Sequence, residues 1–222
     1  MGIVDNIRRI EETLSEGVTL VAVSKTKPVE DILEAYRGGQ RIFGENKVQE
    51  MCTKHEQLPQ DIQWHLIGHL QSNKVKYIVP FVAMIHSIDS LELLRKVNVA
   101  ARKAGRVVDC LLEVRIAEED TKFGLAGPQA VELAVSDEVA GMENVRVRGL
   151  MGMASFTENK GQICREFSAL KGFFDRLKEK MPQVDTLSMG MSGDYLLAVQ
   201  CGSTMVRVGS SIFGERNYKV EG

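Results

Sequence analysis

The chain has 222 residues, of which 44% are hydrophobic and 26% charged, and its formal net charge is −2. These values are typical of a globular protein with a sizeable core, and the lack of a basic excess argues against a nucleic-acid-binding face. Four scattered cysteines without a CxxC pair, a charged amino-terminal segment and the lack of a long apolar run predict a cytoplasmic protein with no signal peptide and no membrane span.

Two kinds of segment alternate along the chain after an initial helix, which is expected over residues 3–15. Short, apolar, β-branched segments predict strands buried on both faces, as in parallel sheets. They cover residues 18–23, 41–43, 63–66, 83–86, 107–114, 145–150, 186–189 and 204–208. Charged segments in which apolar residues recur at helical spacing predict helices between the strands. These cover residues 29–36, 46–57, 72–79, 91–104, 128–135, 162–181 and 194–200.

This alternation predicts a fold of the α/β class. Eight strands interleaved with helices indicate a closed (β/α)₈ TIM barrel, here preceded by one extra N-terminal helix. An open doubly wound sheet shares the alternation but suits eight parallel strands in a chain of this length less well. No linker or repeat divides the sequence, so residues 1–222 are expected to form a single domain. In such barrels the functional residues sit at the carboxyl ends of the strands.

Lys25 follows the first strand, in the stretch LVAVSKTKP. Side chains alternate along a strand, so Lys25 shares a face with Val21 and Val23. If that face points into the barrel, the Lys25 amine lies over the mouth, where a desolvated lysine can form a Schiff base with an aldehyde. Taken alone, however, the stretch is more typical of an exposed rim lysine. Lys27 lies past the strand, before Pro28, and is expected to be a solvated loop residue.

Glycine- and serine-rich loops follow the last two predicted strands. Residues 188–194 read SMGMSGD, and Gly209, Ser210 and Ser211 follow the strand at 204–208. A glycine followed by small hydroxyl residues at a strand-to-helix turn offers backbone N–H groups to a phosphate. Barrels usually bind phosphate at the loops after strands 7 and 8, so the two loops together predict a phosphate site.

Two polar residues lie at the ends of the second and third strands. Asn46 and His65 could donate hydrogen bonds into the mouth, although Asn46 could equally be a helix N-cap. His65 and His69 have a spacing found in zinc sites, but Gly68 interrupts the segment and no HExxH pattern is present, so no metal site is expected. Lys122, in the loop after the fifth strand, is expected to be a rim charge. No Walker, GxGxxG or GxSxG motif is present, which disfavours ATP hydrolysis, dinucleotide chemistry and α/β-hydrolase catalysis.

Five motifs together resemble those of one known family. AVSKTKP, FGENKVQE, WHLIGHLQSNK, LSMGMSGD and GSTMVRVGSSIFGER run in the family's order from residue 22 to residue 216. They closely resemble the YggS/PLPBP family of pyridoxal 5′-phosphate (PLP) homeostasis proteins, which is similar to the barrel domain of alanine racemases. The resemblance implies an alanine racemase N-terminal-domain-like barrel that binds PLP and takes part in vitamin B6 homeostasis.

The resemblance also implies which residues meet the reactive end of the cofactor. Lys25, the first lysine of SKTKP, would hold PLP as a reversible Schiff base. Asn46 would lie near the cofactor, with the His65 region close by. Lys47 departs from the pattern, because many members have a tyrosine after GEN, and this change would alter the charge at the mouth.

Four further residues are implied at the other parts of the cofactor. Ser192, Gly209 and Ser210 would bind the phosphate, and Arg207 would face the pyridine nitrogen. A permanently charged arginine there would discourage protonation of that nitrogen, which weakens PLP as an electron sink. The expected chemistry is therefore capture and release of PLP rather than efficient turnover.

Racemisation is the main alternative to this carrier function. It needs acid and base groups on both faces of the substrate carbon, and in the resembling racemases one base comes from a second domain that this chain is not expected to have. We therefore expect a PLP-binding protein without robust catalysis, with a weak PLP-dependent amino-acid racemase, or a less favoured Schiff-base aldolase without PLP, left open. The expected partners are PLP and PLP-dependent apo-enzymes, with no nucleic acid or membrane, and the protein is expected to be a monomer.

Overall fold

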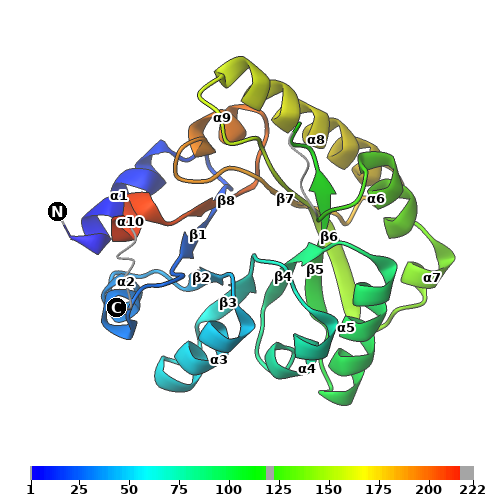
Figure 1. Ribbon diagram of the computed structural model, residues 1–222, viewed down its shortest axis with the longest axis horizontal. Coiled ribbons are helices and arrows are strands. Elements are labelled where there is room, and N and C mark those ends of the chain that lie inside the picture. Colours follow the sequence, from blue (N-terminus) through cyan, green and yellow to red (C-terminus); the bar gives the residue numbers. More distant parts are fainter. Residues whose placement is uncertain (1, 119–122, 216–222) are drawn as a thin grey trace, which may run out of the picture.

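The computed structural model describes residues 2–118 and 123–215. Eight parallel strands follow one another in chain order around a closed barrel, and β8 pairs with β1 (Figure 1). The strands are β1 (Thr19–Val23), β2 (Ile42–Glu45), β3 (Gln63–Leu66), β4 (Met84–Ile88), β5 (Val108–Arg115), β6 (Val145–Met153), β7 (Thr186–Ser188) and β8 (Met205–Val208). This arrangement confirms the predicted (β/α)₈ TIM barrel.

Helices lie around the outside of the barrel, between the strands (Figure 1). They are α1 (Ile3–Thr13), α2 (Val29–Arg37), α3 (Val48–Gln57), the 3₁₀ turn η1 (Ser72–Lys74), α4 (Val75–Ile78), α5 (Leu91–Lys103), α6 (Gly127–Ala134), α7 (Asp137–Ala140), α8 (Lys160–Lys180), α9 (Tyr195–Gln200) and α10 (Ser210–Phe213). The helix expected before the first strand is α1, so the extra N-terminal helix is also confirmed.

Alternation along the strands divides the apolar side chains into two regions. One small cluster fills the barrel interior and consists of Val21, Met84, Leu111, Met151 and Met205. The opposite strand faces pack against the helices and form the larger core. Val21 points into the barrel. Residues 23 and 25 follow it on the same face of β1, so their side chains are expected to point toward the mouth of the barrel.

The junction of β8 and β1 sets the geometry of the mouth. In its register Val21 lies opposite Arg207, and Ala22 lies opposite Val208. The segments that follow the two strands, which carry Lys25 and Gly209, therefore emerge side by side at the same rim.

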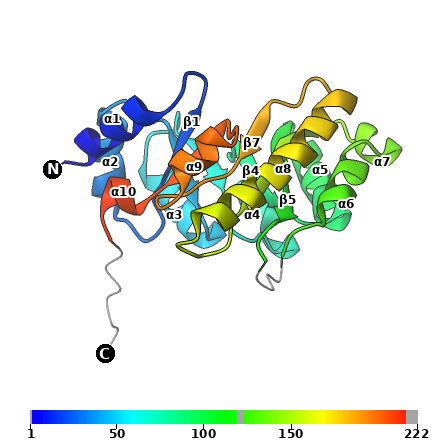
Figure 2. The ribbon, with the colours of Figure 1, turned by 90° about the horizontal axis from the view of Figure 1, so that it is seen from above.

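The extra helix α1 supports this rim from outside. It lies beside α10 in both views of the ribbon (Figures 1 and 2). Asn6 Nδ2 donates a hydrogen bond of 2.9 Å to the Ile212 carbonyl of α10, and Ile7 and Ile10 are buried. Across the described residues, no helix combines the length and apolar character that crossing a membrane requires.

The structure differs from the expected helices at several places. The helix expected from Asn46 begins at Val48 instead. Residue 46 belongs to the connection before the helix, and this connection passes so close to Gly68 that a Cβ there would lie 2.4 Å from the Asn46 carbonyl oxygen. The helices α7 and α10 were not expected, since four residues are too few to give a periodic pattern. The predicted rim charge Lys122 lies outside the described residues.

Candidate functional site

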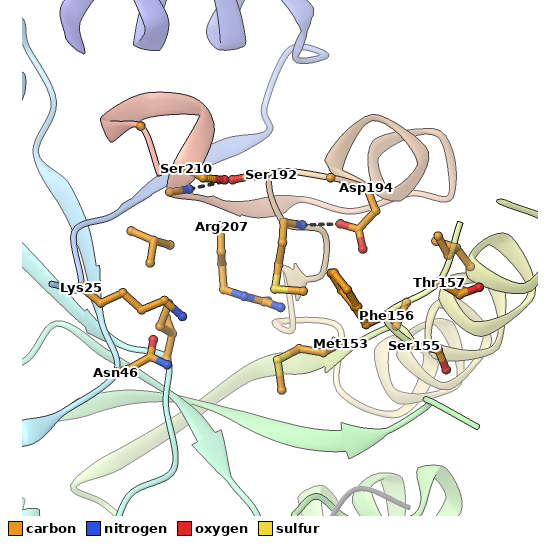
Figure 3. A pocket seen from close by; sticks show the side chains of 18 of the residues that line it. Lys25, Asn46, Met153, Ser155, Phe156, Thr157, Ser192, Asp194, Arg207 and Ser210 are labelled. Carbon is orange, nitrogen blue, oxygen red and sulfur yellow. Dashed lines mark hydrogen bonds between the residues drawn. The ribbon is translucent and has the colours of Figure 1, made fainter. Parts of the chain in front are cut away.

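A cavity of about 360 Å³ lies at the carboxyl ends of the strands, within the size range of small-molecule sites. Figure 3 shows Lys25 on one side of it, Arg207 near the centre, and Met153 and Phe156 on the side away from Lys25. The residues predicted for the site that line this cavity are Lys25, Asn46, Ser192, Arg207, Gly209 and Ser210. The structure therefore brings together all of the predicted residues except His65.

Lys25 enters the cavity because of its place in the strand alternation. Val21 belongs to the barrel interior, and Val23 and Lys25 both line the cavity. Ser24 points to the other side of β1, where its hydroxyl donates a hydrogen bond of 2.6 Å to Glu45. The predicted parity of this segment is confirmed, and Lys25 extends into the pocket (Figure 3).

A buried ionic cluster holds the turn that carries this lysine; we call Ser24, Glu45, Glu50 and Lys54 the turn-holding cluster. Lys54 Nζ donates to the Ser24 carbonyl at 2.8 Å and to one carboxylate oxygen each of Glu45 and Glu50 at 2.7 Å. Glu50 also accepts the Thr26 backbone N–H at 2.6 Å. Thr26 has a positive φ of 64°, which is unfavourable for a β-branched residue. The cluster therefore fixes the backbone on both sides of the cavity lysine.

Lys27 differs from its prediction. Its Nζ donates hydrogen bonds of 2.8 Å and 2.9 Å to the carbonyls of Phe213 and Glu215, at the end of α10 and just beyond it. It also lines the cavity. Lys27 is thus a tie between the segment after β1 and the segment after β8, rather than a solvated loop residue.

Arg207 lies at the bottom of the cavity and is almost fully buried. Its guanidinium donates to Ser188 Oγ at 2.5 Å and to the Gly152 carbonyl at 3.0 Å. Burial lowers the pKa of Arg207 to about 10, while Asp194 and Glu113 act to raise it. Arg207 therefore stays positively charged at neutral pH and faces a ligand as a fixed cation.

The loops after β7 and β8 are joined to each other beside Arg207. The Gly209 N–H donates to Ser192 Oγ at 3.1 Å (Figure 3). A Cβ at Gly209 would lie 3.1 Å from the Val23 carbonyl, so glycine allows this loop to approach β1 closely. Ser210 and Ser211 are the first two residues of α10, so their backbone N–H groups have no carbonyl of a preceding helical turn to bond. This corner of the cavity offers hydroxyls and backbone donors to an anion.

Asp194 shapes the loop after β7. Its carboxylate accepts the Met191 N–H at 2.5 Å (Figure 3), which closes the turn before α9. Burial raises the pKa of Asp194, while the Met191 hydrogen bond and the Arg207 charge act to lower it. Asp194 thus contributes an acidic group to the cavity wall, and the hydrogen bond from the Met191 N–H sets the position of this carboxylate.

Asn46 is not the N-cap of α3, because that position belongs to Lys47. Asn46 lines the cavity, and its buried Oδ1 has no hydrogen-bond partner among the described residues. A buried amide oxygen without a protein partner is typical of a group that a ligand or water satisfies. Lys47 itself is exposed and is not one of the described cavity-lining residues.

His65 lies inside the barrel instead of at its mouth. It shares the inward face of β3 with Ile67, and Ile67 is the residue that lines the cavity, so His65 is one layer deeper. Its Nδ1 is 2.9 Å from Nε2 of buried His86. His69 lies at the surface, where Nδ1 is 3.4 Å from Asp89, so the two histidines with zinc-like spacing do not converge. The prediction that His65 donates into the mouth is corrected accordingly.

One wall of the cavity consists of residues that were not among the predicted site residues. It comes from the end of β6 and the segment before α8, and its residues are Met153, Ala154, Ser155, Phe156 and Thr157. The apolar run of the sixth strand extends to Met153, three residues beyond its expected end at Leu150. Following the alternation to Met153 would have placed this wall at the rim.

Comparison with known proteins places this geometry in a family. Residues 2–217 match the model of the alanine racemase N-terminal domain family. A Pasteurella multocida protein named pyridoxal phosphate homeostasis protein is 36% identical, over 98% of this chain and 99% of the relative. The structure of PipY from Synechococcus elongatus, solved with PLP bound, is 35% identical, with a TM-score of 0.86 over 96% of this chain and 100% of PipY. A Clostridium difficile alanine racemase is only 15% identical but has the same fold, with a TM-score of 0.77 over 98% of this chain and 60% of the racemase.

Proposed function

Since the chain belongs to the family of pyridoxal phosphate homeostasis proteins, we propose that it binds PLP in the cavity at the carboxyl ends of the strands and contributes to PLP homeostasis. The observation that carries the proposal is the meeting of three kinds of group in one cavity. An amine (Lys25), a buried cation (Arg207) and an anion-binding corner (Ser192, Gly209, Ser210) match the aldehyde, the pyridine nitrogen and the phosphate of PLP.

Lys25 would attach the cofactor covalently and reversibly. Its unprotonated amine adds to the aldehyde carbon and a water molecule leaves, which gives a Schiff base that hydrolysis reverses. PLP supplies an electron-withdrawing ring and a reactive aldehyde when it is bound. The turn-holding cluster keeps Lys25 directed into the cavity before the cofactor arrives, which reduces the entropy that binding must remove.

The remaining residues would orient the cofactor without taking part in the bond. Ser210 would present its N–H and hydroxyl to the phosphate, and Ser192 its hydroxyl hydrogen, while Gly209 donates its N–H to Ser192 Oγ and allows the loop to come close to β1. Arg207 presents its positive charge to the ring nitrogen and so disfavours protonation there. Asn46 has an amide oxygen without a partner among the described residues and can complete the set of polar contacts.

We infer that the protein is a PLP carrier without robust catalysis. Among the described residues that line the cavity, Lys27 and Asp194 are the other side chains with an amine or a carboxylate, and both are committed to backbone partners. Racemisation needs two such groups on opposite faces of the substrate carbon. A weak PLP-dependent amino-acid racemase is the second candidate, favoured by the acidic Asp194 in the cavity wall.

The proposed setting of this function is the cytoplasm. The free thiols of the four cysteines suit a reducing compartment. PLP-dependent apo-enzymes are the recipients that fit reversible capture and release of PLP. We propose that the protein acts as a monomer, without nucleic acid or membrane.

Absorbance spectroscopy tests PLP binding. Incubation with PLP is expected to produce a visible Schiff-base band that is absent from Lys25→Ala and present in Lys27→Ala, which removes the neighbouring cavity lysine. A colourless wild-type protein contradicts the proposal.

Chiral analysis separates carrier from racemase. The PLP-loaded protein is incubated with a panel of L-amino acids, and the D-enantiomers are measured. We expect the D-enantiomers to form no faster than they do with free PLP. Rapid turnover that Lys25→Ala abolishes would show that the protein is an enzyme and contradict the carrier function.

A further inference from the structure

A chain of buried polar side chains runs from Arg207 into the barrel. Arg207 contacts Ser188 Oγ at 2.5 Å, Ser188 Oγ is 3.1 Å from His86 Nδ1, and His86 Nε2 is 2.9 Å from His65 Nδ1. All four side chains are at least 97% buried. His65 also lines a second cavity, of about 400 Å³, at the other end of the barrel. The chain therefore crosses the barrel interior between the two cavities.

The hydrogens of this chain have one consistent arrangement. Arg207 can only donate, so Ser188 accepts from it, and the Ser188 hydroxyl hydrogen remains available. Among the described residues, His86 Nδ1 is the acceptor found for that hydrogen. His86 must then carry its hydrogen on Nε2 and donate it to His65 Nδ1. The reverse arrangement would leave the Ser188 hydroxyl hydrogen buried without a partner, which is costly.

The charge of Arg207 favours the same arrangement. In it every acceptor atom of the chain faces the guanidinium and every hydrogen points away from it, so the bond dipoles align with the positive charge. The neutral state of both imidazoles agrees with their burial. Burial lowers the pKa of His65 to about 4, and burial together with the charges of His65 and Arg207 lowers the pKa of His86 well below its usual value.

We propose that His86 is a positioning residue for the cavity: through Ser188 it holds the Arg207 guanidinium in the orientation that faces a ligand, and His65 accepts the hydrogen that His86 carries on Nε2. The inference rests on the proposed function only in naming PLP as that ligand. Arg207 would otherwise be held by the Gly152 carbonyl alone among its described hydrogen-bond partners. A long side chain with one anchor can rotate, whereas two anchors on different strands define its plane.

The first test needs no cofactor. The chain has 4 histidines, so nitrogen-15 NMR of the unliganded protein can resolve every ring. We expect both His86 and His65 to be neutral at pH 7, with the hydrogen on Nε2 and with Nδ1 unprotonated. A hydrogen on Nδ1 of His86 would reverse the chain and overturn the proposal.

The second test removes the link to Arg207. Ser188→Ala is compared with Ser203→Ala, which deletes another buried hydroxyl whose partners are the carbonyls of Leu187, Met189 and Met205. We expect Ser188→Ala to shift the PLP absorbance maximum and to weaken PLP binding about tenfold or more, the scale of losing a hydrogen bond to a charged group. Ser203→Ala should lose comparable stability with an unchanged spectrum. Equal spectra in the two variants contradict the positioning role.

The third test asks whether the acceptor at His86 is what matters. His86→Asn can place an amide oxygen where Nδ1 lies, and is expected to keep most of the wild-type spectrum. His86→Leu removes the acceptor and is expected to match Ser188→Ala. If both variants behave alike, His86 contributes only packing. Because the Schiff base depends on Lys25, a band that forms in all these variants with no shift contradicts the inference alone, whereas its absence from the wild-type protein contradicts the proposed function.

Discussion

Lys54→Met probes the turn-holding cluster behind the cavity. The substitution keeps the length of the side chain but removes the charge that contacts Ser24, Glu45 and Glu50. Glu45 is fully buried and would keep one hydrogen bond, from Ser24. Glu50 would still accept the Thr26 N–H but would lose its i,i+4 ion pair with Lys54 within α3.

The expected loss is large because both partners of the main ion pair are buried. Lys54 is 5% exposed and Glu45 is 0% exposed. Removing one member of such a pair costs about 3–5 kcal/mol, since the other charge stays behind without a partner. Burial already raises the pKa of Glu45 against the lowering effect of Lys54, so the variant is expected to take up a proton at Glu45. In a chain of this size the loss corresponds to a decrease in Tm of about 6–20 °C.

Urea unfolding followed by circular dichroism measures the effect. The matched control is Lys96→Met, which breaks the exposed i,i+4 pair with Glu92 and should cost less than about 1 kcal/mol. In the double variant Lys54→Met/Glu45→Gln the uncompensated charge is gone, so part of the loss should be recovered. If Lys54→Met is as stable as Lys96→Met, the buried cluster does not hold the turn and the reasoning is refuted.

Three further measurements address the barrel and the site. Gly149→Ala would place a Cβ 1.7 Å from the Thr186 carbonyl oxygen and is expected to lower the free energy of unfolding, measured by thermal unfolding, by about 3 kcal/mol or more. Gly172→Ala, in open space within α8, should raise it by about 1 kcal/mol, and similar stabilities of the two variants would contradict the β6–β7 contact. The pKa of His65 is about 4 instead of 6.5, so the unfolded chain binds this proton first as the pH falls, and His65 should lower the free energy of unfolding by about 3 kcal/mol from pH 6.5 to below pH 4. His65→Gln should remove this part of the slope and leave the part that buried His86 contributes, and an unchanged slope would refute the assignment. Arg207→Glu should change the absorbance of bound PLP by favouring a protonated ring nitrogen, and an unchanged spectrum would place Arg207 away from that nitrogen.

The sequence predicted the features that depend on short-range periodicity. Strand parity gave the direction of Lys25, because the side chains on either side of it alternate between the interior and the helices. The loop positions after β7 and β8 followed from counting strands, and Ser192, Gly209 and Ser210 lie together as expected. The assignment of residues 1–222 to a single domain stays a prediction.

Other features depend on contacts between distant residues, which one sequence does not reveal. Lys54 is nine residues beyond Glu45, and its burial follows from the way α3 packs behind the turn after β1. The depth of His65 depends on how far β3 extends toward the rim, where Ile67 takes the position expected for the histidine. The part played by Lys27 likewise depends on α10, a helix too short to predict.

The central claim is that the Lys25 amine holds PLP, and borohydride labelling tests it most directly. The PLP-loaded protein is reduced, which converts the carbon–nitrogen double bond to a stable secondary amine, and the modified lysine is located by peptide fragmentation. The account predicts a phosphopyridoxyl group on Lys25, with Lys27 unmodified in the same peptide. A label on Lys27 or on a lysine outside the cavity, or no label at all, would contradict it.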